Sequence, residues 1–441
     1  MLEFILIVLF GLVMGVAIGL LPGLPAFLSL IILYPLIDHL TVDQILAYWL
    51  ATQIGSQYFG SVAAILLRIP GEASSMVYIN DLAKVGTQDR YDLVRQTAWG
   101  STLGSFVSLV ALVAVYYIGA GDLLMHLTAM NVKIVVLSVL MFTLIWFTEH
   151  RWVSALLFAV GVFFSEKSNQ NLPDWVFHMQ RYSTDVTVFS LLLALIVIPE
   201  FIAEMKKDFS DNTLNLDAKE LTYNKLDFKN MFRGTWIGSL VGFIPGPSTI
   251  LASIVSYNSH GKNKDVATVK QAVISSEAAN NSAAITSLLP FLYIGLPITL
   301  SEMILFDFLK VKMFTVPTDF VNTTIIPHTN FIEFSFVLIA VCVIAYHFLA
   351  QHFLKFYEVV MENLYGKLKW LYLGLIVYII YVDVHFNPVD LTRYMAFLVS
   401  LTFVGQWLLR HRINVLPLLF GYILGDMITW ASYNFYRIYF F

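Results

Sequence analysis

Long hydrophobic runs, separated by short polar stretches, dominate the chain. Eight runs stand out, namely Phe4–Leu21, Thr97–Ile118, Val132–Phe147, Val186–Ile202, Phe331–Ala350, Leu368–Val382, Tyr394–Leu409 and Val415–Trp430. Each is close to the roughly 20 residues that an α-helix needs to cross a bilayer, and none shows the period-two alternation of a membrane β-strand. With the shorter apolar segments included, the pattern predicts about ten to twelve transmembrane helices.

The composition agrees with a protein whose solvent is a lipid bilayer. Hydrophobic residues make up 58% of the chain and charged residues 13%, with a mean hydropathy of +0.74, well outside the average for soluble domains. Lipid cannot hydrogen-bond to the backbone, so the spans must be helices or a closed barrel. We predict an all-α polytopic membrane protein. Met1 to Phe4 carry no basic start, so the first run is interpreted as a retained helix and not as a cleaved signal.

A motif of the form Gly-x-x-x-Gly-x-x-Pro-Gly occurs twice. It is "GVAIGLLPG" at Gly15–Gly23 and "GSLVGFIPG" at Gly238–Gly246, an offset of 223 residues. Five positions at identical spacing are improbable by chance in a chain with 24 Gly and 14 Pro. The chain is therefore predicted to contain two membrane repeats, residues 1–203 and 234–441, joined by a polar linker over residues 204–233.

The linker also bears on topology. It carries six basic residues, whereas no Lys or Arg precedes the first motif. Basic residues in short loops favour the cytoplasm, so the two motif helices are expected to enter the membrane from opposite sides, as in an inverted-topology repeat. The linker itself is interpreted as a solvated, cytoplasmic segment.

The Pro-Gly pairs are predicted to break their helices. Proline removes an intrahelical hydrogen bond, and free backbone groups at membrane depth must find other partners. Paired broken or re-entrant helices that meet near the midplane are typical of secondary transporters. For the Gly-x-x-x-Gly part of each motif we favour close helix packing. After the second break, Ser248 and Thr249 are suited to cap a new half-helix.

A second, looser repeat places amides at matched positions. The segments Gly55–Gly71 and Ser275–Pro297 are both apolar but contain many small and hydrogen-bonding residues, and Gln57 matches Asn280 at the same offset of 223. Glu277 lies beside Asn280 and Asn281, and it is assigned to cation coordination, proton coupling or orientation of the Asn pair, with a structural hydrogen bond as the alternative. Hard oxygen ligands of this kind suit Na⁺.

The predicted substrate- and ion-binding residues come from both repeats. They are Pro22, Gly23, Ser56, Gln57, Ser61, Pro245, Gly246, Ser248, Thr249, Glu277, Asn280 and Asn281. Arg68 can pair with a substrate carboxylate, but interfacial snorkelling is the favoured interpretation. Four acids near predicted helix ends, Glu302, Asp307, Asp383 and Asp426, are interpreted as interfacial, and the single cysteine, Cys342, as a packing residue.

Enzyme classes lack their signatures here. The sequence contains no Gly-x-Ser-x-Gly elbow, no His-Glu-x-x-His and no phosphate-binding Gly-x-x-x-x-Gly-Lys-Ser/Thr loop. No Cys or His pair has the spacing of a metal site, and a net charge of −4 gives no nucleic-acid signature. We predict a transporter without a catalytic site or cofactor, apart from Na⁺ or H⁺ as a coupling ion. A channel, or a stand-alone carrier for another small solute, is the alternative.

Several ordered blocks resemble the large membrane subunit of the tripartite tricarboxylate transporters. They are Gly15–Gly23, Ile65–Gly71 with Ser75 and Asp81 following, Gly238–Gly246 followed by Ala252–Tyr257, and Ser276–Asn281 leading to Ile294–Pro297. The chain departs from the family at Pro25 and Ser248, where Gly is usual, and at Ser276, where Pro is usual.

The resemblance implies a permease of the bacterial inner membrane. Such a permease receives a small carboxylate from a periplasmic solute-binding protein and imports it with a sodium or proton gradient, beside a small four-helix membrane subunit. Combined with the two breaks, it predicts a midplane site for a carboxylate and a cation, alternately exposed as this part of the protein moves against the remaining helices.

Overall fold

The computed structural model describes most of the chain, and all regular structure within it is helical. The described residues are 2–21, 24–68, 72–119, 150–165, 188–205, 224–244, 248–294, 297–311, 328–352, 367–386 and 391–422, with a few positions between 138 and 148 and position 425. No strand occurs in these ranges. The predicted all-α class is thereby confirmed.

The chain forms two compact units. Unit 1 consists of Met1–Met125 and Phe209–Gly366, and unit 2 of His126–Asp208 and Lys367–Phe441. Each unit takes its residues from both halves of the sequence, so compactness does not follow the boundaries of the two predicted repeats. A compact unit does not have to coincide with a sequence repeat. The two repeats, their boundaries and their inverted topology therefore stay predictions.

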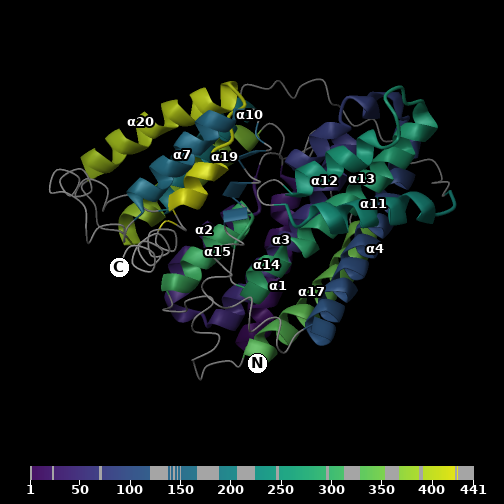
Figure 1. Cartoon of the computed structure of the whole chain (residues 1–441), viewed down its shortest axis with the longest axis horizontal. Helices are drawn as coiled ribbons and strands as arrows, with labels where there is room; N and C mark the ends of the chain where they lie inside the picture. The colour runs from purple at the N-terminus through teal and green to yellow at the C-terminus, as the bar shows by residue number, and fades with distance from the viewer. Residues whose placement is uncertain are drawn as a thin grey trace, which may run out of the picture. The chain divides into compact units, whose positions relative to one another are not determined.

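Unit 1 carries most of the described helices (Figure 1). In chain order they are α1 (Leu2–Leu20), α2 (Leu28–Leu33), η1 (Tyr34–His39), α3 (Val42–Leu67), η2 (Ala73–Val77), η3 (Asp81–Lys84), α4 (Thr87–Gly119), α11 (Phe228–Val241), α12 (Ser248–Asn258), α13 (Val266–Thr286), α14 (Leu288–Ile294), α15 (Leu300–Val311) and α17 (His328–His352). Capping side chains define two of the starts. Thr41 and Gln44 form a capping box at α3, and Asp265 accepts from Thr268 N at α13.

Unit 2 is a smaller helical group. It contains α7 (Arg151–Phe164), α9 (Val188–Leu192), the π-helical turn η5 (Leu193–Val197), α10 (Ile198–Met205), α19 (Leu368–Phe386) and α20 (Leu391–Arg410). The π turn lies just before Pro199, whose missing N–H and bulky ring disturb the preceding helical turn. α20 packs on η5 and α10. Asp383 of α19 is buried and accepts a hydrogen bond of 2.7 Å from Tyr394 of α20.

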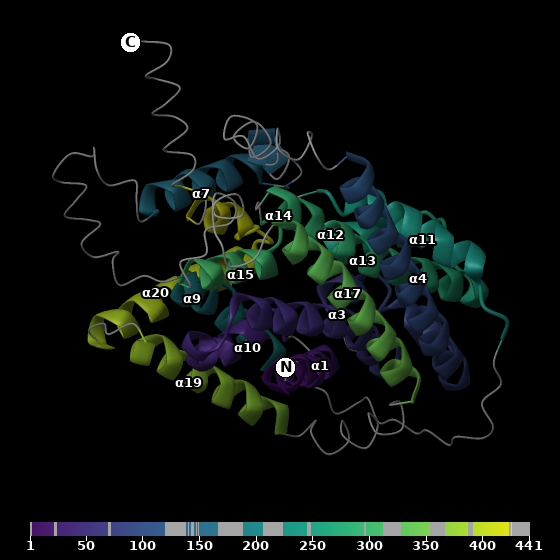
Figure 2. The ribbon, with the colours of Figure 1, turned by 90° about the horizontal axis from the view of Figure 1, so that it is seen from below.

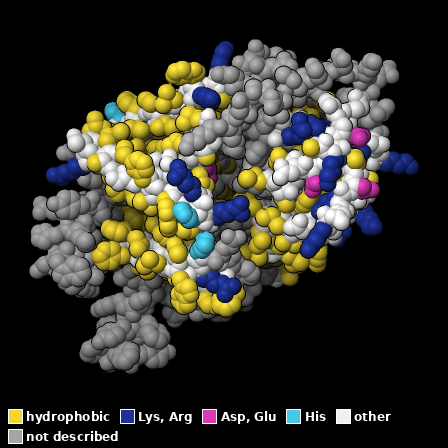
Figure 3. All heavy atoms as spheres, turned by 90° about the horizontal axis from the view of Figure 1, so that it is seen from above, with side chains coloured by type: hydrophobic (Ala, Val, Ile, Leu, Met, Phe, Trp, Pro, Cys, Tyr) yellow, Lys and Arg dark blue, Asp and Glu magenta, His cyan; other side chains and the backbone are white. Residues whose placement is uncertain are grey.

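Four helices in the described part of the chain are long and apolar enough to cross a membrane. They run over Leu2–Leu20, Thr87–Ile118, Glu333–Ala350 and Leu368–His385, at positions where the sequence predicts spans. Their outward faces are apolar, as at Leu6 and Val13 of α1 and Val341 of α17. Hydrophobic side chains also cover much of the described surface visible in Figure 3. The chain is a membrane protein, and the expected total of about ten to twelve crossings stays a prediction.

Two long helices, α3 and α13, are more polar than a lipid-facing helix. α3 has 26 residues and α13 has 21, and nearly all of α3 and the whole of residues 275–286 in α13 are buried by other parts of the protein. α3 packs against α1 on one side and α17 on another, as Figure 2 also shows. α13 packs against α4, α11 and α12. Because these neighbours separate α3 and α13 from lipid, both helices can carry serines, amides and an acid.

Each motif helix packs its glycines against the polar helix that follows it. α1 lies on α3, where a Cβ at Gly19 would come within 2.8 Å of the Ser56 carbonyl oxygen. α11 lies on α13, where a Cβ at Gly238 would come within 2.8 Å of the Cα of Ala279. Close packing, the interpretation favoured from the sequence, is therefore what the Gly-x-x-x-Gly pairs do.

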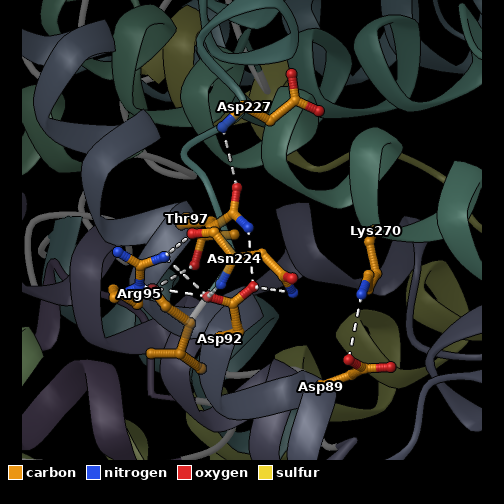
Figure 4. A network of polar contacts seen from close by, with 9 residues as sticks. Asp89, Asp92, Arg95, Thr97, Asn224, Asp227 and Lys270 are labelled. Atoms are coloured by element: carbon orange, nitrogen blue, oxygen red, sulfur yellow. Dashed lines mark hydrogen bonds and ion pairs between the residues drawn. The ribbon is translucent and has the colours of Figure 1, made fainter. Parts of the chain in front are cut away.

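The described end of the predicted linker is tied to the start of α4 (Figure 4). Asn224 donates to both carboxylate oxygens of Asp92, at 3.2 Å from its backbone N and 2.9 Å from Nδ2. Arg95 pairs with Asp92 at 2.9 Å, and Gln96 accepts from the backbone N–H of Asp227 at 3.1 Å. Residues 224–227 are thus fixed to unit 1. Of the other linker residues, 204–205 end α10, 228–233 begin α11, and 206–223 lie outside the described part.

Candidate functional site

A buried acidic residue of α13 lies at the centre of the polar part of unit 1. Glu277 is only 1% exposed. Its Oε1 accepts a hydrogen bond of 2.6 Å from the hydroxyl of Tyr78, which itself is fully buried. Its second oxygen, Oε2, has no hydrogen-bond partner among the described residues. A buried acceptor without a partner is destabilising, because its hydrogen bonds to water are lost on burial and are not replaced by hydrogen bonds within the protein.

A second acid, Glu72, lies close to the same place. It comes from the segment before η2, and its side chain packs against Gly60 of α3, where an added Cβ would be 2.6 Å from the Glu72 Cγ. Asn280 Nδ2 contacts Glu72 Oε2 at 3.5 Å, and Ser74 donates to the same oxygen at 3.3 Å. Both bonds are long. The carboxyls of Glu72 and Glu277 interact electrostatically with one another.

Asn280 links the two acids and has a free acceptor of its own. Its amide nitrogen reaches Glu72, and its side chain also interacts with Glu277. Its Oδ1 is buried and has no partner in the part of the chain that the structure describes. We call Glu72, Tyr78, Glu277 and Asn280 the acid cluster. Its defining property is a surplus of buried oxygen acceptors over donors.

A small cavity between α3, α4 and α13 is lined by further amides. Asn281 donates to Ser101 Oγ of α4 at 2.8 Å and to the carbonyl oxygen of Glu277 at 3.1 Å. Gln57 of α3 is 5% exposed, and its Oε1 has no partner among the described residues. The full lining is Leu50, Gln53, Ile54, Gln57, Ser105, Asn281, Ala284, Ile285 and Leu288. The space suits about one water molecule.

α12 runs antiparallel to α13 with a regular register. The hydroxyls of Ser256 and Ser275 are 2.7 Å apart, Ser253 and Ser276 exchange weak hydrogen bonds, and Ala252 packs on Ala279 and Ala283. One turn further towards its start, Ser248 is therefore level with Ala283. Ser248 is the first described residue of α12; it is 1% exposed, and its hydroxyl has no partner among the described residues.

The structure brings several of the predicted site residues together. Ser56, which interacts with Glu72, belongs to α3, and α3 contacts α13, the helix that carries Glu277 and Asn280. Gln57 and Asn281 meet at the cavity. The hydroxyls of Ser56 and Ser61 both donate to carbonyl oxygens of α3 itself, Gln53 O and Tyr58 O, and Ser56 in addition interacts with Glu72.

Other predicted residues lie elsewhere or are not described. Thr249, which follows Ser248 in α12, is half-buried. Pro22, Gly23, Pro245 and Gly246 lie outside the described residues, so the helix breaks stay predictions. Of the four acids interpreted as interfacial, Asp426 and the side chain of Asp307 are not described either.

Three functional candidates were missed from the sequence: Glu72, Tyr78 and Ser101. Glu72 directly follows Pro70-Gly71, and an acid beside a Pro-Gly pair that ends an apolar run is a usable signal. Tyr78 and Ser101 carry no such signal, because a tyrosine or a serine near a membrane helix has many ordinary roles. Only the packing of the 72–84 segment on α12 and α13, and of α4 on α13, shows that Tyr78 faces Glu277 and that Ser101 faces Asn281.

Two charged residues near the site have structural positions. Arg68 is exposed and forms the C-cap of α3 in the left-handed conformation, with φ 58°, which agrees with the snorkelling interpretation. Glu302 is 1% exposed and caps α15, accepting from the backbone N–H groups of Ile298 at 2.7 Å and Thr299 at 3.0 Å. Glu302 is thus buried within unit 1, with donors for its carboxylate.

A second set of polar contacts, around Asp81, also fixes the 72–84 segment. Asp81 accepts from Lys84 Nζ and from the Tyr257 hydroxyl, each at 2.6 Å. The bond from Lys84, followed by that from Tyr257, lowers the pKa of Asp81 below its usual 3.8. Tyr257 in turn lies beside Tyr78, with ring centroids 6.3 Å apart. Asp81 therefore helps to position the segment that carries Tyr78.

Asp81→Asn is expected to lower the unfolding temperature at pH 7. The difference from the wild type should become smaller as the pH is lowered. Because the folded-state pKa is depressed, the carboxylate stabilises the fold above its unfolded pKa of about 3.9, and this contribution is lost as pH falls through the folded value. Thermal unfolding of both proteins in detergent between pH 7 and pH 3 measures the difference. A difference that does not change with pH would mean that the charge of Asp81 is unimportant.

In unit 1, apolar helices long enough to span a membrane surround a shielded cluster of oxygen acceptors that have no partner among the described residues, an arrangement typical of helical membrane transport proteins. The family model of the tripartite tricarboxylate transporter TctA family matches residues 5–420, and the chain belongs to this family. It is therefore a transporter component and not an enzyme, as predicted.

One relative is only distantly similar. An uncharacterised 52.8 kDa protein of the TAR-I ttuC′ 3′ region of Agrobacterium vitis is 26% identical over 312 residues, covering 65% of this chain and 60% of that protein. The chain thus aligns with less than two thirds of this relative. No solved structure matches.

Proposed function

We propose that this chain is the permease of a tripartite uptake system and carries a small carboxylate across the bacterial inner membrane together with a cation. Family membership supports the transport role and the existence of partners. The proposed partners are a periplasmic solute-binding protein that delivers the carboxylate and a small four-helix membrane subunit. The substrate class, the coupling and the partners are the parts that go beyond the family assignment.

The start of α12 is the observation that supports an anionic substrate. The N–H groups in the first turn of a helix lack intrahelical partners, and the helix dipole adds positive potential there. α12 has 11 residues, and the buried Ser248 hydroxyl at its start lacks a partner among the described residues. A carboxylate placed there would accept from these N–H groups and from Ser248.

The distance between this helix start and the acid cluster supports coupling. Extending the register of the Ser256–Ser275 and Ala252–Ala279 contacts by one turn puts Ser248 level with Ala283, six residues from Glu277 along α13; the axial part of the separation is about 9 Å. A substrate anion at α12 and a cation at the acid cluster would attract each other across this distance in a medium that screens charge poorly. Each would then bind better when the other is present, which is the requirement for symport.

Uptake into proteoliposomes tests the proposal. The purified permease and small subunit are reconstituted, supplied with the carboxylate-loaded binding protein, and given an inward Na⁺ gradient or a proton gradient. We expect saturable accumulation of chemically unaltered carboxylate that needs both the binding protein and a cation gradient. Flux that needs neither and does not saturate would contradict the proposal and favour a channel. Saturable flux without the binding protein would favour a stand-alone carrier.

A further inference from the structure

We propose that Glu72, Glu277 and Asn280 form a binding site for Na⁺, buried between α3 and α13. Binding of the ion follows from the chemistry of the cluster itself. Its role as the coupling ion rests on the function proposed above. The site contains two residues that the sequence indicates for substrate or ion binding, Glu277 and Asn280, and one that only the structure reveals, Glu72.

The charges of the cluster are not balanced by protein groups. Glu277 is 1% exposed, and Glu72 contacts Asn280 across the same buried space. The partners of the two carboxyls among the described residues are Tyr78, Ser74, Asn280 and Ser56, all neutral, and no Lys, Arg or His of the described residues pairs with either acid. Glu277 is fully buried and Glu72 is partly buried, and two neighbouring carboxylates repel each other and are costly to desolvate. A bound cation offsets part of both penalties.

Glu302 is a buried acid of the same unit whose carboxylate receives its hydrogen bonds from the protein itself. Like Glu277, it is 1% exposed and lies on a helix. Its carboxylate accepts two backbone N–H bonds, at 2.7 and 3.0 Å, and a longer bond from the Ser287 hydroxyl. Glu277 accepts a close hydrogen bond from Tyr78 and lies near the Asn280 side chain, but its Oε2 accepts no hydrogen bond from the described residues. Burial alone therefore does not leave a carboxylate oxygen free in this fold.

The ligand atoms favour a hard monovalent cation. The free acceptors are Glu277 Oε2 and Asn280 Oδ1, and the carboxyl of Glu72 lies beside them. All are oxygens, the ligands of hard cations, and the thiolates and imidazoles that select transition metals are not among them. Ca²⁺ takes six to eight oxygens, more than this cluster offers. The same negative charge excludes a substrate carboxylate from the cluster itself.

Binding of Na⁺ alone can be measured without transport. The purified protein in detergent is titrated with NaCl against choline chloride at constant ionic strength, at pH 6 and pH 8, and its thermal unfolding is followed. We expect the unfolding temperature of the wild type to rise by several degrees with Na⁺, because a ligand that binds only the folded state stabilises it. KCl should give a smaller rise.

Variants then locate the ion. Glu277→Gln and Glu72→Gln keep size but remove charge, and each should weaken Na⁺ binding at least ten-fold. Glu302→Gln is the matched control and should keep the wild-type Na⁺ affinity, even if its unfolding temperature falls overall. If Glu277→Gln fails to fold, Asn280→Ala removes a neutral ligand oxygen and should also weaken binding.

Three results would overturn the site. They are a wild type without any Na⁺-specific rise, a rise that depends only on pH, as for protons, and variants of the cluster that keep the wild-type affinity. The proposed function is judged separately. Na⁺ binding that is lost in the variants while the wild type shows no coupled uptake would support the ion site and contradict symport. Coupled uptake by a wild type that does not bind Na⁺ would support symport and contradict the ion site.

Discussion

Glu277→Gln is expected to abolish cation-driven uptake of carboxylate, reducing the initial rate by about 100-fold or more, or roughly 2.7 kcal/mol. Glutamine has nearly the same size and can still accept from Tyr78, whose hydroxyl lies 2.6 Å from Oε1. It cannot supply the negative charge at Oε2, the oxygen that has no partner among the described residues. The fold should therefore survive and the coupling should not.

The measurement is gradient-driven uptake in proteoliposomes, normalised to the amount of permease inserted. Glu302→Gln is the control, because this acid is equally buried but is satisfied by the backbone of its own helix start. We expect Glu302→Gln to retain most of the uptake per folded molecule. Normal uptake by Glu277→Gln, with an unchanged dependence on the cation gradient, would remove Glu277 from the mechanism.

Gly238→Val is expected to prevent α11 from packing on α13, with a loss of about 3 kcal/mol or more in the free energy of unfolding. A Cβ at this position would lie 2.8 Å from the Cα of Ala279 and even closer to the carbonyl oxygen of the same residue. Both atoms belong to backbone and cannot rotate away, so the helices must separate. Ala279 also packs on Ala252 of α12, which extends the effect to the start of the proposed substrate site.

The yield of monodisperse protein and its unfolding temperature in detergent measure this loss. Gly374→Val in α19 is the matched control, because it makes the same change within a helix where, outside that helix's own backbone, no atom of the described residues lies within 4 Å of the added Cβ. The intrinsic cost of valine in a helix is common to both variants. Equal stability of the two variants would show that the close contact at Gly238 is unimportant.

The sequence by itself determined the class of this protein. Apolar runs of about 20 residues can be read directly, because a bilayer requires that length regardless of how the helices are packed. The runs beginning at Phe4, Thr97, Phe331 and Leu368 are helices in the structure. The Gly-x-x-x-Gly pairs were also interpreted correctly as packing faces, because close approach of two helices depends on the absence of a side chain, a local property.

The tertiary structure alone decided which polar side chains share one place. Glu72 and Glu277 are far apart in sequence, and only the folding of the 72–84 segment onto α13 brings them together through Asn280 and Tyr78. Ser56 and Ser61 were predicted together from their positions in the sequence, and both hydroxyls bond within α3, but the structure places Ser56 beside Glu72 as well. Hydrophobic length is set by the solvent and is visible residue by residue, whereas the balance of buried donors and acceptors is set by contacts between distant segments.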